Sequence, residues 1–137
     1  MTARRRARLM AVQALFELDF HNRLPDEAVA ERLAEAKLSP ENQEFVHDLV
    51  HGVLHHKEEI DARIAAVAPQ WPIEQIAHVD KNVLRVAIFE LMSEDTRVPA
   101  KVAINEAVEL ARLLGSGTSP KFVNGVLGAV MALKEVN

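Results

Sequence analysis

The chain has no cysteine and no tyrosine, and aromatic residues amount to only 4% of its 137 positions, with a single tryptophan. The absence of cysteine excludes disulfides, thiolate metal sites and a cysteine nucleophile, and it fits a reducing compartment. Because aromatic side chains are scarce, Ala, Val, Leu and Ile must supply most of the core volume. With 49% hydrophobic and 26% charged residues, the composition is that of a folded globular domain.

Long apolar runs and the sequence signatures of enzymes are also missing. No run approaches the roughly 20 apolar residues that a membrane-spanning helix needs, and no signal-peptide stretch follows the basic N-terminus. We therefore expect a soluble, cytoplasmic protein. The chain lacks the glycine-rich phosphate-binding loops and the G-x-S-x-G motif. We predict a binding protein, not an enzyme, with neither a cofactor nor a metal ion.

Negative charge is absent from the first sixteen residues, which contain Arg4, Arg5, Arg6 and Arg8. The chain has 16 Lys+Arg and 20 Asp+Glu, so without these four arginines the remainder has a net charge of −8. Cations in the first turns of a helix oppose the helix dipole, which indicates that they serve a partner outside the helix. Guanidinium groups pair well with the phosphates of a nucleic acid. A solvated terminus and an acidic protein partner are the alternatives.

Apolar residues recur with helical spacing along the whole chain, and no segment shows the alternation of a strand, so we predict an all-α fold. Gly52 indicates a bend or a close contact with a neighbouring helix. Pro69 and Pro72 interrupt the pattern and place a boundary between an N-terminal subdomain, 1–68, and a C-terminal subdomain, 69–137. We expect two small antiparallel three-helix bundles packed together. The expected helices span residues 3–19, 26–37, 40–68, 80–93, 100–114 and 119–134.

The start of the last expected helix has the composition of a ligand site. Ser119 is in the position of an N-cap, with Pro120 at the first helical position. Free backbone N–H groups there, together with Lys121 and Asn124, suit a phosphate or a base edge. An exposed edge of Phe122 suits stacking on an unpaired base. The alternative is that Ser119 only caps the helix and Phe122 belongs to the core.

Three histidines, His47, His51 and His55, are spaced four residues apart and therefore lie on one side of a helix. Two histidines at this spacing can chelate zinc, but no glutamate lies inside the pair as it does in H-E-x-x-H. We interpret the three as a solvated histidine face and predict no metal site.

Several longer segments carry a resemblance to a known family. They are RRRAR and AVQALFELD within 4–19, LVHGVLHHKEEID at 49–61, VDKNVLRVAIFEL at 79–91, VPAKVAINEAVELAR at 98–112 and KFVNGVL at 121–127. In this order, over nearly the whole chain, they resemble the NusB family of bacterial transcription antitermination factors. The resemblance implies an all-α protein of two helical bundles that binds boxA RNA, a short single-stranded element of nascent transcripts. It also implies ribosomal protein NusE and the RNA polymerase antitermination complex as partners, notably on ribosomal RNA operons.

The resemblance also implies which residues make these contacts. The implied RNA-binding residues lie in the basic N-terminus, at one position of the expected helix 80–93 and around the start of the last helix: Arg4, Arg5, Arg6, Arg8, Arg85, Thr118, Ser119, Lys121, Phe122 and Asn124. The implied NusE-binding residues are Phe16, Glu74 and Asp80. Phe16 stands where a tyrosine is common, so a phenolic hydrogen bond is lost. Thr118 replaces a frequent acidic residue, and less negative charge there favours RNA binding.

Two other interpretations stay open at the level of sequence. NusB-like domains also occur fused to ribosomal RNA cytosine methyltransferases, although this chain has no cofactor-binding half. A structural helical adaptor is the other alternative, and apolar helix faces are compatible with a homodimer. The RNA-binding prediction requires the N-terminal arginines and the start of the last helix to lie side by side and form one cationic surface.

Overall fold

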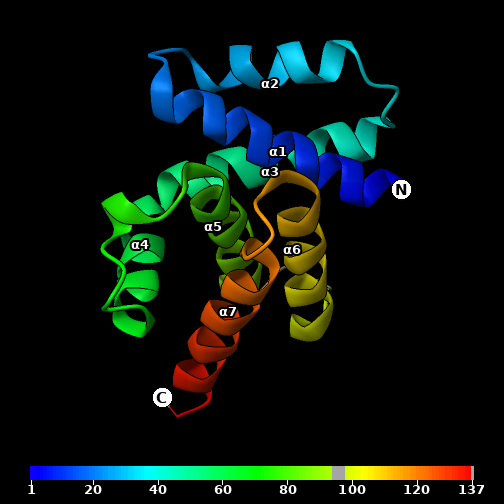
Figure 1. Cartoon of the computed structure of the whole chain (residues 1–137). Coiled ribbons are helices and arrows are strands. Elements are labelled where there is room, and N and C mark those ends of the chain that lie inside the picture. The colour runs from blue at the N-terminus through cyan, green and yellow to red at the C-terminus, as the bar shows by residue number, and fades with distance from the viewer. Residues whose placement is uncertain (94–97, 137) are drawn as a thin grey trace.

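Helices account for all of the regular secondary structure in the described part of the chain, so the predicted all-α fold is confirmed (Figure 1). The computed structural model describes residues 1–93 and 98–136, and it describes side chains up to residue 134. The elements are α1 (Ala3–Phe20), α2 (Pro25–Ala34), α3 (Pro40–His55), α4 (Lys57–Val67), the short 3-10 helix η1 (Ile73–Gln75), α5 (His78–Met92), α6 (Ala100–Leu114) and α7 (Ser119–Val136).

Helix α5 lies at the centre of the fold and packs against α1, α3, α4, α6 and α7 (Figure 1). Its side chains Val83, Leu84 and Ile88 are completely or almost completely buried. Helices α2 and α3 pack on α1, and α6 packs on α7, around one hydrophobic core that includes residues of every α-helix. A helix in contact with five others must be apolar on most of its circumference, which the sequence of α5 provides.

The predicted single helix over 40–68 is wrong, because the chain leaves helical geometry at His56 (φ −106°, ψ 17°). The bend redirects α4 so that its apolar residues Ile60 and Ile64 are buried, and α4 packs on α5 and α7. Helix α4 thus contacts two helices that follow it in the sequence, while the division of the chain between residues 68 and 69 stays a prediction.

Gly52 makes a close contact with α5, as the sequence analysis allowed. A Cβ atom at this position would overlap the ring of Phe89, so the phenyl ring occupies the space that any other residue would need. This glycine is retained in the middle of a helix for steric reasons, against its low helix propensity.

The predicted serine caps are found at the start of α3 but not at the start of α7. The Ser39 hydroxyl accepts a hydrogen bond from the Asn42 N–H at 3.2 Å, with Pro40 in the first turn, as predicted. Ser119 differs, because its hydroxyl accepts from the Ser116 N–H at 2.9 Å and so closes the loop before α7. Gly115 permits this closure, since a Cβ atom there would overlap the Ser119 side chain.

Candidate nucleic-acid interface

The four N-terminal arginines share the first turns of α1 but lie in different environments. Arg8 is only 4% exposed, and its guanidinium donates two hydrogen bonds to the buried carboxylate of Glu90 on α5, at 2.8 and 2.9 Å. A buried carboxylate without this partner would be strongly destabilising. Arg8 therefore joins α1 to α5, and its guanidinium group is paired with a carboxylate inside the protein.

Arg5 and Arg4 are half-exposed, and their ion pairs are more accessible to solvent than that of Arg8. Arg5 donates two hydrogen bonds to Glu106 on α6, at 2.8 and 3.1 Å. This hydrogen-bonded ion pair raises the pKa of Arg5 and lowers the pKa of Glu106. The Arg4 guanidinium lies 4.0 Å from the centre of the Phe45 ring, and one of its nitrogens is 3.6 Å from a Glu41 oxygen.

Arg6 is half-exposed and forms no salt bridge with any residue that the structure describes. It is therefore the N-terminal cation whose charge is most available to an incoming phosphate.

Arg85 is buried at the centre of a polar network between α1, α4 and α5. Its Nε and Nη2 atoms donate to the two Asp61 oxygens at 2.9 Å each, and its Nη1 atom lies 3.4 Å from Asp19. Asp19 also accepts hydrogen bonds from Asn82 and His78, at 2.8 and 3.1 Å. Burial by itself raises the pKa of Asp19, but these hydrogen bonds and the charge of Arg85 outweigh it, so the pKa is lowered.

The start of α7 exposes polar groups next to an aromatic pair. Lys121 and Asn124 are exposed, and no described residue forms a hydrogen bond or salt bridge with either side chain. Phe122 is half-buried against Trp71, with ring centroids 6.2 Å apart and planes at 73°. Trp71 is 53% exposed. The Trp71–Phe122 pair therefore presents aromatic surface beside free hydrogen-bonding groups.

A hollow of about 360 Å³ lies beside this pair, and its wall includes Trp71, Phe122, Thr118 and Asp80. Asp80 is 9% exposed, and its Oδ1 atom is buried with no hydrogen-bond partner within the described part of the chain. Ser119 is buried, because its hydroxyl closes the preceding loop. From the sequence, Trp71 was noted only as the single tryptophan of the chain, and the helix break was placed at Pro69 and Pro72. Its position between two prolines gave no signal of this role.

The two cationic segments belong to helices that are not among the extensively packed pairs of the described structure. Helix α1 packs mainly on α2, α3 and α5, whereas α7 packs mainly on α4, α5 and α6. The connection between the segments runs through α6, which Arg5 reaches by way of Glu106. A carboxylate lies beside each segment, Glu106 at the first and Asp80 at the second. Helix α6 contacts both segments, through the Arg5–Glu106 pair and its packing on α7, and the side-by-side arrangement of the two segments stays a prediction.

A separate aromatic patch, defined here as Phe16, Phe20 and His78, covers the junction between the end of α1 and the start of α5. The Phe16 and Phe20 ring centroids are 5.1 Å apart, and those of Phe20 and His78 are 4.5 Å apart. Phe20 is 55% exposed, and Glu74 on η1, the element that precedes α5, is also exposed. Phe16 and Glu74 are among the residues that the family resemblance implied, whereas Phe20 and His78 were not singled out from the sequence.

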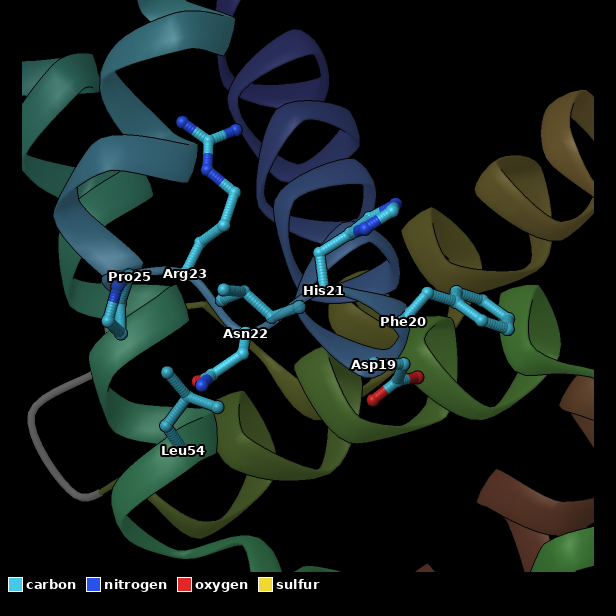
Figure 2. A pocket seen from close by; sticks show the side chains of 8 residues that line it. Asp19, Phe20, His21, Asn22, Arg23, Pro25 and Leu54 are labelled. Atoms are coloured by element: carbon cyan, nitrogen blue, oxygen red, sulfur yellow. The ribbon is translucent and has the colours of Figure 1, made fainter.

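A depression of about 430 Å³ lies at the end of α1. Figure 2 shows the side chains that line it. Its lining comes from the α1–α2 connection, including Asn22 and Arg23, and from Leu54 of α3. The one carboxylate that lines it, Asp19, is already bound by Asn82, His78 and Arg85. The depression therefore offers no free acid–base pair for catalysis. In the part of the chain that is described, no helix is long and apolar enough to span a bilayer.

Comparison with known proteins identifies the family. A model of the NusB family matches residues 5–132. The transcription antitermination protein NusB of Roseiflexus sp. (strain RS-1) is 49% identical over 130 residues, which cover 94% of this chain and 92% of that protein. T. maritima NusB has a TM-score of 0.87 at 33% identity, over 96% of this chain and 92% of that chain. A chain in a crystal structure of antitermination factors NusB and NusE with dsRNA has a TM-score of 0.84 at 29% identity, over 97% of this chain and 98% of that one. Because these matches span nearly the whole sequence, the chain belongs to the NusB family.

Proposed function

We propose that this chain is a non-enzymatic transcription antitermination factor that binds boxA RNA of nascent transcripts together with ribosomal protein NusE. Family membership supports this function, as does the similarity to a chain from a complex of NusB, NusE and RNA. The protein acts in the cytoplasm, where it joins the antitermination complex on RNA polymerase.

The RNA-binding surface centres on the start of α7. The observation that carries this assignment is the free Lys121 and Asn124 side chains beside the exposed Trp71–Phe122 pair. Lys121 contacts a phosphate, Asn124 contacts a base edge, and the aromatic pair stacks on an unpaired base. Thr118 lies at the rim of the adjacent hollow and adds no negative charge.

The N-terminal arginines extend this surface with phosphate contacts. Arg6 and Arg4 are the available cations, and Arg5 contributes when a phosphate replaces Glu106 as its partner. Arg8, Arg85 and Ser119 are left out of the proposed contact set, because their polar groups are buried and hydrogen-bonded within the protein. These three residues hold the helices that present the RNA-binding groups.

The NusE-binding surface is proposed to be the aromatic patch with Glu74 at its edge. Exposed aromatic side chains supply apolar contact area, and a neighbouring carboxylate favours a basic ribosomal protein. Asp80 lines the hollow beside the Trp71–Phe122 pair, and we include its carboxylate, whose Oδ1 atom has no hydrogen-bond partner among the described residues, in the proposed partner-binding set.

The Lys121→Glu variant tests the RNA-binding surface. We expect binding of a boxA oligonucleotide to weaken by about tenfold or more, because a phosphate contact is replaced by repulsion. Affinity for NusE alone and the melting temperature stay unchanged, since Lys121 is exposed and has no described partner. The measurement is a fluorescence-anisotropy titration with boxA and scrambled oligonucleotides, with and without NusE.

Lys101→Glu is the matched control, because Lys101 is an exposed lysine at the start of a different helix, α6. It alters the net charge by the same amount and is expected to leave boxA affinity nearly unchanged. Equal affinities of the two variants for boxA would refute the assignment to the start of α7. A steep salt dependence with boxA and a weaker one with the scrambled sequence separates this function from a structural adaptor.

A further inference from the structure

The tertiary structure brings an aspartate to two of the histidines on α3. His47 and His51 lie one helical turn apart, with ring planes at 12° and centroids 6.2 Å apart. Asp26, in the first turn of α2, places its Oδ1 atom 2.6 Å from His51 Nε2 and 3.5 Å from His47 Nδ1. One potential ligand atom from each of the three residues lies within 4.8 Å of the other two. The third histidine of the stripe, His55, instead packs edge-on against His56.

This set of groups has the chemistry of a metal site. Imidazole nitrogen and carboxylate oxygen are ligands of zinc, and two histidines four residues apart can bind one ion from the same helix face. Tetrahedral zinc with bonds of about 2.1 Å needs its ligand atoms about 3.4 Å apart. The Asp26–His47 separation already has this value, at 3.5 Å, and the shorter contact with His51 opens by rotation of exposed side chains.

The charges favour a cation at the same point. Among the residues that the structure describes, the ionic contacts of Asp26 are with His47 and His51 alone, and no lysine or arginine pairs with it. This carboxylate therefore faces the ring nitrogens of two imidazoles, which can serve as neutral metal ligands. All three side chains are substantially exposed, which leaves further coordination positions open to water.

We propose that Asp26, His47 and His51 bind one zinc ion, or a divalent ion of similar ligand preference, between α2 and α3. The ion ties the first turn of α2 to the middle of α3. Helix α2 buries only Ala28 and Val29 and has no side-chain hydrogen bond at its N-cap, so an added link to α3 stabilises its docking. No metal site was predicted from the sequence, because no glutamate lies inside the histidine pair. Asp26 lies 25 residues from His51 and neighbours it only in the folded chain.

Calorimetric titration of the full-length, untagged chain with ZnCl₂ after chelator treatment tests this proposal. We expect one saturable site in the wild type and a higher melting temperature with zinc, because a ligand of the folded state stabilises it. His51→Gln and Asp26→Asn are each expected to weaken zinc binding by about tenfold or more. Circular dichroism checks that these exposed substitutions leave the helices intact.

His55→Gln is the matched control, since it removes an exposed histidine of the same helix from outside the cluster. It is expected to bind zinc like the wild type. Absence of saturable binding in the wild type, or equal weakening by His55→Gln and His51→Gln, would overturn the proposal. Wild-type affinity of Asp26→Asn would also overturn it, because the site would then be a histidine pair without a bridge to α2. These outcomes are independent of RNA binding.

Discussion

At the scale of residues, the N-terminal arginines show how one residue type takes different roles within two helical turns. Arg8 faces α5 and ends at a buried carboxylate, whereas Arg6 forms no salt bridge with a described residue. The difference follows from helix geometry, because neighbouring positions point in different directions around the axis. A basic motif in a sequence is therefore a mixture of structural and binding residues.

Substitution of these two arginines separates the roles. Arg8→Ala is expected to lower the free energy of unfolding by about 3–5 kcal/mol, because Glu90 is left buried and unpaired. Arg6→Ala is expected to change it by less than about 0.5 kcal/mol but to weaken boxA binding. Urea denaturation and an RNA titration of both variants measure these effects. Similar stability losses in both variants would contradict the distinction.

At the scale of elements, the junction between α3 and α4 and the packing of α5 decide the shape of the fold. Helix α3 passes so close to α5 that the Phe89 ring fills the space beside Gly52. Helix α4 then changes direction at His56 and packs on both α5 and α7. Local propensity favours continuation of the helix through this point, but burial of Ile60 and Ile64 overrides it.

A pair of glycine substitutions tests the steric role of this contact. Gly52→Ala is expected to lower the free energy of unfolding by about 1–3 kcal/mol, because its methyl group overlaps the Phe89 ring. In Gly128→Ala, on α7, the methyl group meets no atom within 4 Å, so helix propensity raises stability by up to about 1 kcal/mol. Thermal and urea denaturation measure whether each variant lowers or raises the free energy of unfolding. A stabilised Gly52→Ala variant would show that the Phe89 ring can make room for a Cβ atom and that glycine is not required at this position.

At the scale of the whole molecule, buried and half-buried ion pairs join helices that are distant in sequence. Arg85 links α5 to Asp61 on α4 and Asp19 on α1, and Arg5 links α1 to Glu106 on α6. Asp19 and Glu106 both have lowered pKa values in the folded chain. Stability from these two carboxylates is fully present above their unfolded pKa values and is lost as pH falls through the folded ones.

Acid denaturation tests this network. With ordinary pKa values of 3.8 for Asp19 and 4.5 for Glu106, we expect little loss of stability from these groups between pH 7 and about pH 5.5, and a progressive loss below about pH 4.5. Asp19→Asn is expected to be less stable at pH 7 and to lose less stability on acidification. Asp48→Asn, at an exposed position on α3, is the control and keeps the wild-type profile. An unchanged acid profile in Asp19→Asn would exclude this carboxylate as a source of the pH dependence.

Helices and their starts were largely predictable, because caps, prolines and helical spacing act over a few residues. Ser39 caps α3 as predicted, and the bounds of α6 match the expected 100–114. The exceptions are positions where distant packing overrides local preference, such as the break at His56 and the inward hydroxyl of Ser119. Of the candidate site, the sequence indicated the aromatic Phe122 and the polar Lys121 and Asn124. It gave no indication that Trp71 would be their neighbour.

By itself, the sequence determined that this is a helical binding protein with positive charge concentrated at its start, because periodicity, composition and charge are local properties. Only the tertiary structure decided which cations remain available. Arg8 meets Glu90 across 82 residues, and Arg5 meets Glu106 across 101. The tertiary structure likewise brought Asp26 to His51 and Trp71 to Phe122. Burial and pairing depend on contacts between distant segments, and those contacts exist only once the helices have packed.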